Sequence, residues 1–348
     1  MEMKVEKKRE APPNSFGAQV WRQFSRSTLN KLGLALILAT FFVAIFAPFL
    51  ASNVPLYLKV EDRVYFPILR EVFPTKYWVH YPDLPQENWE KSPLLKKEDT
   101  VALWAPIPYS PTQYDLNAIL MPPSSDHWLG TDEQGRDVAS RLIYGSRVSL
   151  TVGFFAVAIY VLIGIFFGAC AGYFGGVTDI VISRLIEIMI CFPTFFLILA
   201  VLAFVGPGIR NIILVIGFTG WTGVARLVRG EFLKLRQSDY VTSAKAQGAR
   251  WYRIVFRHIL PNALTPVIVS ISFGIASAIL YESSLSFLGF GVQPPTPSWG
   301  DILSQSHDFI DIAWWLTVFP GVAIFLTLTS YNLVGEGLRD AIDPRLKN

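Results

Sequence analysis

Charged residues are scarce in this sequence. Asp, Glu, Lys and Arg make up 16% of the 348 residues, whereas hydrophobic residues make up 52%. Soluble domains carry about 25% charged residues on average. The deficit excludes an ordinary soluble domain and is typical of a chain that runs largely through a membrane.

Cysteine and histidine are also rare, with two and four copies. Cys170 and Cys191 offer neither a disulfide framework nor metal-ligand spacing. The sequence contains no GxxxxGK[ST] phosphate loop, no HExxH and no GxSxG motif. It therefore predicts no catalytic residue, no cofactor and no metal in this chain, which has no means of its own to hydrolyse ATP or a peptide bond.

What the sequence does contain is a series of long apolar blocks. Residues 32–51 carry no charge, and a helix of about 20 residues is about 30 Å long, enough to cross a hydrocarbon core. Five further blocks follow at 149–173, 185–205, 211–225, 263–281 and 312–334. The sequence predicts an all-α membrane protein with six transmembrane helices. The Lys- and Arg-rich residues 1–31 are long for the start of a signal peptide, so the first block is interpreted as an uncleaved anchor.

The distribution of positive charge predicts the orientation. Basic residues are dense in 1–31 and in the predicted loop 226–261, whereas the short loops on the opposite side contain only Arg210. Positive charge collects on the cytoplasmic side. The arm 1–31, the loop 226–261 and the tail 335–348 are therefore predicted to be cytoplasmic.

The segment 52–147 is predicted to form an extracytoplasmic insertion with an amphipathic segment, lying between helix 32–51 and a core at 148–334 that carries the other five predicted transmembrane helices. The insertion is rich in Pro and aromatic residues. Its aromatics could form a small core or hold a ligand, and the core is the favoured interpretation. The candidates are Tyr65, Phe66, Trp78 and Trp104.

Few ionisable residues fall in or beside the predicted spans. Arg184 and Glu187 are three apart and can form an ion pair. Glu282 lies near the outer end of the fifth span, where it could line a substrate path or reach the interface.

A stripe of small residues marks the second span. Gly164, Gly168 and Gly172 recur every four residues. Such a stripe lets another helix approach closely, so a packing role is expected.

The stretch SAKAQGARWYRIVFRHILPNAL, residues 243–264, has four Lys and Arg residues and no acidic one. It predicts a short helix over 240–247 that is capped by Ser238 or Asp239 and ended by Gly248. A second, amphipathic helix is expected from Ala249 and should stop before Pro261, along the membrane surface. The first helix carries small residues, which suit docking into a cleft on a cytoplasmic partner. Nucleic-acid readers instead need long side chains that reach the bases, so no nucleic-acid partner is expected.

This stretch resembles the coupling-loop motif of ABC importer permeases, whose pattern is Glu-Ala-Ala, three residues, Gly, nine residues, Ile-x-Leu-Pro. Four positions match it: Ala244, Gly248, Leu260 and Pro261. Thr242 and Ser243 stand in place of Glu and the first Ala, and His258 replaces the Ile.

Further segments are similar to the second permease subunit of dipeptide and oligopeptide importers. They are HWLGTDEQGRDVASRLIYGSRVSL, GYFGGVTDIVISRLIEIMICFPT, GWTGVARLVRGEFLKLRQSDYV, ESSLSFLGFGVQPPTPSWG and NLVGEGLRDAIDPR. The long insertion, with VYFPIL and LWAPI, resembles the branch that imports oligopeptides and peptide antibiotics of the microcin C kind.

The resemblance implies a type I importer permease of the bacterial cytoplasmic membrane. Its expected partners are a homologous permease, two cytoplasmic ATPase subunits that bind ATP and Mg, an extracytoplasmic peptide-binding protein, and membrane lipid. The expected ATPase-coupling residues are Thr242, Ser243, Ala244, Lys245, Ala246, Gln247, Gly248, Leu260 and Pro261. A gradient-driven carrier or channel, a scaffold without transport, and an importer of nickel or another small solute remain as alternatives.

Overall fold

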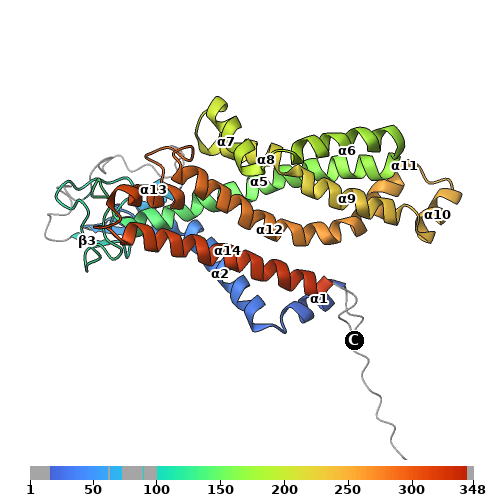
Figure 1. The fold of residues 1–348 in the computed structure, drawn as a ribbon. Helices are drawn as coiled ribbons and strands as arrows, with labels where there is room; N and C mark the ends of the chain where they lie inside the picture. Colours follow the sequence, from blue (N-terminus) through green and yellow to red (C-terminus); the bar gives the residue numbers. More distant parts are fainter. Residues whose placement is uncertain (1–15, 62, 73–88, 90–99, 343–348) are drawn as a thin grey trace, which may run out of the picture.

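The computed structural model describes residues 16–61, 63–72, 89 and 100–342. Long helices run side by side as a bundle, with a small β-sheet and α13 at one end and α10 and α11 at the other (Figure 1). These two ends are called the sheet end and the loop end below. The predicted helical architecture is confirmed.

The elements follow one another in this order. The N-terminal part comprises α1 (Phe16–Phe24), α2 (Thr28–Ile45), α3 (Ala47–Leu50), β1 (Tyr57–Val60), β2 (Arg63–Tyr65), α4 (Ile68–Val72) and β3 (Thr100–Leu103). The bundle continues with α5 (Val138–Phe174), α6 (Gly176–Ile190), α7 (Thr194–Val205), α8 (Ile209–Thr219) and α9 (Trp221–Leu235). The C-terminal part comprises α10 (Asp239–Ala246), α11 (Trp251–Arg253), the π-helix η3 (Ile254–Ile259), α12 (Leu260–Phe287), α13 (Trp299–Phe309) and α14 (Trp315–Ile342).

Five helical stretches are long and apolar enough to cross a membrane, and a sixth is a bent pair. The five are Thr28–Ile45, Val138–Phe174, Ile209–Leu235, Trp251–Phe287 and Trp315–Ile342. The pair, α6 and α7, bends by 83°. The count of six is reached only when the bent pair is taken as one span.

The bend corrects the prediction of a continuous helix over 185–205. α6 ends at Ile190 and α7 begins at Thr194, and Pro193 between them has a non-helical backbone conformation. Proline has no backbone N–H to donate, and its ring disfavours helical geometry in the residue before it. The apolar block is real, but this break divides it between two helices.

The predicted loop 226–261 is shorter in the structure. α9 continues to Leu235, and a helix resumes at Trp251. The apolar block 211–225 therefore belongs to a longer helical stretch, Ile209–Leu235. Hydropathy marked only the part of this stretch that lacks charged side chains.

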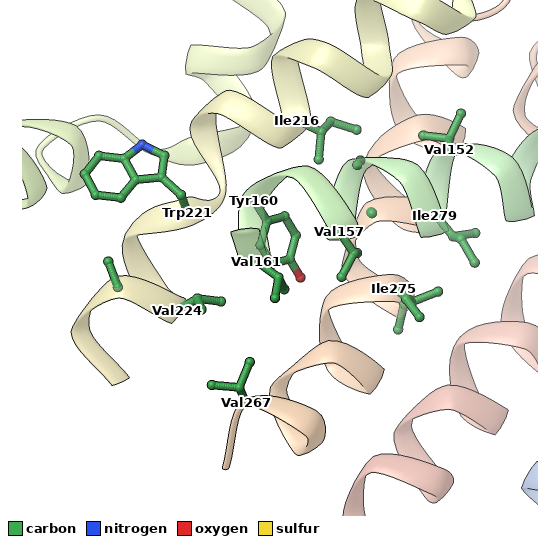
Figure 2. Close-up of a cluster of buried hydrophobic side chains, with 14 of the residues drawn as sticks. Val152, Val157, Tyr160, Val161, Ile216, Trp221, Val224, Val267, Ile275 and Ile279 are labelled. Carbon is green, nitrogen blue, oxygen red and sulfur yellow. The ribbon is translucent and has the colours of Figure 1, made fainter. Parts of the chain in front are cut away.

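α5 is the central helix of the bundle, and its two neighbours approach it from different sides. Figure 2 shows Val157 and Tyr160 of α5 between α12, which carries Ile275, and α9, which carries Val224. All these side chains are buried in one hydrophobic cluster. These residues lie in the apolar helical stretches, where lipid is as apolar as the side chains, so close van der Waals packing is what stabilises the contact.

The glycine stripe lies where α5 meets α9. A Cβ added at Gly164 would lie 2.6 Å from Val224 Cβ, and one added at Gly168 would lie 2.5 Å from the Ala225 carbonyl oxygen. A Cβ at Gly172 would collide with Phe232. The expected packing role is confirmed, because no larger residue fits this contact.

The insertion contains a three-stranded antiparallel sheet in the order β2-β1-β3, which the sequence analysis did not assign. Its buried core is Leu58, Val60 and Trp89, and Tyr65 and Trp104 pack against it. Phe66 was expected in this core but is 44% exposed and contacts the Tyr57 ring instead. Trp78 lies outside the described residues.

Candidate functional site

The predicted docking helix is present as α10 at the loop end (Figure 1). Ser238 is its N-cap by backbone position, but the Ser238 hydroxyl donates to the Leu235 carbonyl instead of accepting from the helix. Gly248 follows the helix with φ of +78°. This is the left-handed conformation that glycine adopts without strain. The predicted start and end of the helix are confirmed.

Most of the surface of α10 is not covered by the rest of the protein. Val241 is its one buried residue, and Ala244 is half-buried. The other residues of the predicted coupling motif in this segment are exposed: Thr242, Ser243, Lys245, Ala246, Gln247 and Gly248. The Tyr240 hydroxyl donates to the His258 carbonyl at 3.4 Å, and the Ala249 N–H donates to the Ala244 carbonyl at 3.1 Å. These contacts hold a short helix whose small side chains face outward.

The chain returns to the bundle through α11 and η3. The sequence predicted that this helix would stop before Pro261, and that prediction is wrong. Trp251–Phe287 is one helical stretch that contains Leu260 and Pro261 at the start of α12. The Leu260 N–H donates to the Val255 carbonyl, five residues back. This wider π turn lies just before the proline, which has no N–H to donate, and the helix continues through it.

A hollow of about 1080 Å³ lies between α10 and this returning helix. The residues around it come from both elements: Tyr240, Ser243, Ala244, Gln247, Gly248, Ala249, Arg250, Tyr252, Arg253, Arg257 and His258. Four of them are basic or histidine, and none is acidic. The structure thus brings the small-residue motif and the arginines around one open space, whereas Leu260 and Pro261 do not line it.

Glu282 is fully buried in α12. Its carboxylate accepts hydrogen bonds from the hydroxyls of Ser286 at 2.8 Å and of Ser149 at 3.0 Å. It therefore reaches no interface in this conformation and ties α12 to α5. Hydrogen bonds of this kind offset the cost of burying a carboxyl group. A role in a substrate path stays a prediction.

Arg184 and Glu187 form the predicted ion pair on α6. Their side chains are 72% and 57% exposed. Pairs that contact water this freely contribute little to stability. The pair is local to α6 and lies on a different element from the hollow.

A buried ionic cluster at the sheet end was not foreseen from the sequence. Asp132 lies within 3.4 Å of both Arg136 and Arg141, and Arg141 also pairs with Asp301 of α13 at 2.5 Å. Burial raises the pKa of the Asp301 carboxyl, although the neighbouring arginines act in the opposite direction. The charge-dense run TDEQGRD was visible, but the cluster is completed by the contact between Arg141 and Asp301, which are 160 residues apart in the chain.

A second pair joins α6 to α9 near the loop end. The Arg229 side chain donates to both carboxylate oxygens of Asp179, with Nη2 2.8 Å from Oδ2. The Arg236 side chain donates to the Tyr173 carbonyl at 2.8 Å. The sequence analysis missed both contacts because it placed these arginines in a loop.

Among the described residues, no group of three or more His, Cys, Asp or Glu could hold a metal ion. What the geometry offers is a bundle of helices long and apolar enough to cross a membrane, with the short exposed helix α10 at one end. Residues 161–348 match the model of the binding-protein-dependent transport system inner membrane component. Residues 15–63 match the N-terminal transmembrane domain of oligopeptide transport permease C.

The relatives agree with these matches. A dipeptide transport system permease of Alkalihalophilus pseudofirmus is 43% identical over 71% of this chain and 82% of its own length. A glutathione transport system permease of Pectobacterium atrosepticum is 42% identical over 71% and 83%. A solved inward-facing structure of the MetNI methionine ABC transporter has 19% identity, a TM-score of 0.45, and covers 57% of this chain and 96% of its own.

The chain belongs to the binding-protein-dependent transport system inner membrane component family. It is a permease subunit of an ABC importer and has the type I importer permease fold.

Proposed function

We propose that this permease forms half of the translocation pathway of an ATP-driven importer for dipeptides, oligopeptides or peptide-like compounds. The names of its relatives, which include dipeptide and glutathione permeases, support this substrate class. The observation that carries the ATP-driven mechanism is α10, a short helix with small exposed residues at the loop end.

The pathway is completed by a homologous permease. Two cytoplasmic ATPase subunits bind ATP and Mg, and an extracytoplasmic binding protein delivers the peptide. The protein lies in the bacterial cytoplasmic membrane with both termini in the cytoplasm. The position of α1 and of the C-terminal part of α14 toward the loop end supports this orientation (Figure 1).

Ala244, Lys245 and Gly248 seat α10 in a cleft of the ATPase, so that closure of the ATPases moves α10. α9 leads into α10 and packs on α5 along the glycine stripe. Close packing transmits displacement because packed helices shift as bodies. Movement of α10 therefore reorients α9 and α5 together, which opens the pathway to one side of the membrane at a time.

A gradient-driven carrier is the main alternative. Such carriers expose ionisable groups to a substrate or ion path within their spans. Glu282 is fully buried and bound by serine hydroxyls, which favours the ATP-driven mechanism.

The test is reconstitution of the complete importer in vesicles. Labelled peptide should accumulate when the binding protein and ATP are both present, and unlabelled peptide should compete while nickel should not. Uptake by the permeases without the ATPase subunits would instead identify a carrier or channel. Uptake of nickel that peptide does not inhibit would identify the small-solute alternative.

A further inference from the structure

We propose that the hollow between α10 and the returning helix receives an acidic segment of the ATPase subunit, held by Arg253 and Arg257. This inference rests on the proposed function and adds the chemistry of the contact. The small residues of α10 allow the ATPase to approach closely, whereas the arginines favour a segment that carries negative charge.

The hollow has a single sign of charge. Arg250, Arg253, Arg257 and His258 contribute to its lining, and no Asp or Glu does. No acidic residue occurs anywhere between Asp239 and Glu282, and Glu282 is buried in α12. The chain therefore provides no carboxylate from this region to neutralise the arginines.

The arginines of the hollow also differ from two arginines nearby in the bundle. Arg229 pairs with Asp179, and Arg236 donates to the Tyr173 carbonyl. Within the part of the chain that the structure describes, Arg253 and Arg257 form neither an ion pair nor a side-chain hydrogen bond and are exposed. Their guanidinium groups are free to bind a carboxylate, often with two parallel hydrogen bonds.

The two walls of the hollow have complementary properties. Ser243, Ala244 and Gly248 form a wall of small residues that lets a segment of another protein approach closely. Arg253 and Arg257 lie one helical turn apart on the opposite wall, where neighbouring side chains share a face. An incoming segment with two carboxylates at similar spacing would contact both walls. A neutral or basic segment would leave the arginines unpaired, which disfavours it.

Cross-linking with a carbodiimide identifies the ATPase residue that lies next to position 253. In Arg253→Lys, the reagent activates a carboxylate, the lysine amine displaces the urea, and an amide joins the two chains. The full complex should yield a permease–ATPase product in which peptide sequencing places Asp or Glu of the ATPase opposite position 253. Arg22→Lys on α1, outside the hollow, is the matched control and should give no such product. Failure to form the product in an intact complex would overturn the proposal.

Reversing the charge of the two arginines measures how much they contribute to binding of the ATPase subunit. Arg253→Glu/Arg257→Glu should weaken ATPase binding by roughly tenfold or more, which corresponds to about 1.4 kcal/mol or more. Arg253→Lys/Arg257→Lys should retain most of the binding, and wild-type binding should weaken as salt rises. Arg22→Glu/Arg26→Glu makes the same change in net charge away from the hollow and should bind normally. Equal loss in that control, or normal binding by the reversal, would contradict the proposal.

An anionic lipid headgroup has the same charge as the proposed segment, and Trp251 and Phe256 are exposed beside the arginines. Association is therefore compared in bilayers of neutral phosphatidylcholine with and without phosphatidylglycerol. The ATPase contact should persist in neutral lipid. Arginine variants that lose only the response to phosphatidylglycerol, with unchanged ATPase binding, would assign the hollow to lipid and overturn the proposal.

Failure of this inference is distinguishable from failure of the proposed function. Ala244→Asp places a carboxylate on the docking wall and should abolish coupling if α10 enters the ATPase. If Ala244→Asp uncouples transport but charge reversal leaves binding unchanged, only the acidic partner is wrong. If Ala244→Asp transports normally, the docking function itself is wrong.

Discussion

Gly168 of α5 faces the Ala225 carbonyl of α9 so closely that a Cβ at position 168 would lie 2.5 Å from the carbonyl oxygen. Real Cβ atoms do not approach an oxygen this closely, so the two helices are in backbone contact at this point. The contact links the central helix of the bundle to the helix that leads into α10.

Gly168→Leu should separate α5 from α9 and destabilise the bundle by about 1 to 3 kcal/mol or more, because overpacking forces backbone shifts. The measurement is the yield and the thermal unfolding temperature of the purified subunit. Gly223→Leu is the matched control, since a Cβ at Gly223 meets nothing within 4 Å. Equal loss in both variants would show that close packing at position 168 is not the cause.

Gly248→Val should uncouple ATP hydrolysis from uptake while the permease still inserts in the membrane. A β-branched residue at φ of +78° is strained by about 1 to 3 kcal/mol, so the turn after α10 would change. Peptide uptake and co-purification of the ATPase subunits measure the effect. Gly248→Asn is the control, because Asn tolerates the left-handed region and should keep most of the activity. Wild-type uptake by the valine variant would rule out this turn as part of the coupling element.

The orientation can be tested with single cysteines at two exposed positions. Cys170 and Cys191 are free and are first replaced by serine. Ser243→Cys at the loop end and Lys59→Cys in β1 should then react with a membrane-impermeant reagent from opposite faces, with Lys59→Cys labelled in intact cells. Labelling of both positions from one face would overturn the topology.

Asp301→Asn should destabilise the sheet end by about 3 to 5 kcal/mol, because it leaves Arg141 with one fewer carboxylate in a buried site. Asp301→Leu combined with Arg141→Met removes both charges and should recover part of the loss. Thermal unfolding of the purified subunit checks both variants. Asp308→Asn on the same helix is the control, since the Asp308 side chain is 79% exposed. A double variant as unstable as the single one would mean that the ion pair is not the source of stability.

The sequence predicted what depends on local composition. Long apolar blocks identified the spans, and the small residues before Gly248 identified α10 with its correct start and end. The bend at Pro193 was missed because hydropathy reports where a segment resides, not whether its helix is continuous. The Arg141–Asp301 contact was missed because it joins residues distant in the chain. In physical terms, composition determines which segments partition into the membrane, whereas tertiary pairing determines which charged side chains are buried in the folded protein.

The π turn at Ile254–Ile259 sets the angular phase of the long helix that carries it. Each residue of an α-helix advances the next side chain by about 100° around the axis. The wider turn alters that advance once, between Arg253 and the membrane-embedded part of α12. The angle around the helix axis between the Arg253 and Glu282 side chains therefore differs from the angle that an uninterrupted α-helix would give. Removing one residue from this turn would rotate the loop end against the bundle while leaving both sequences intact.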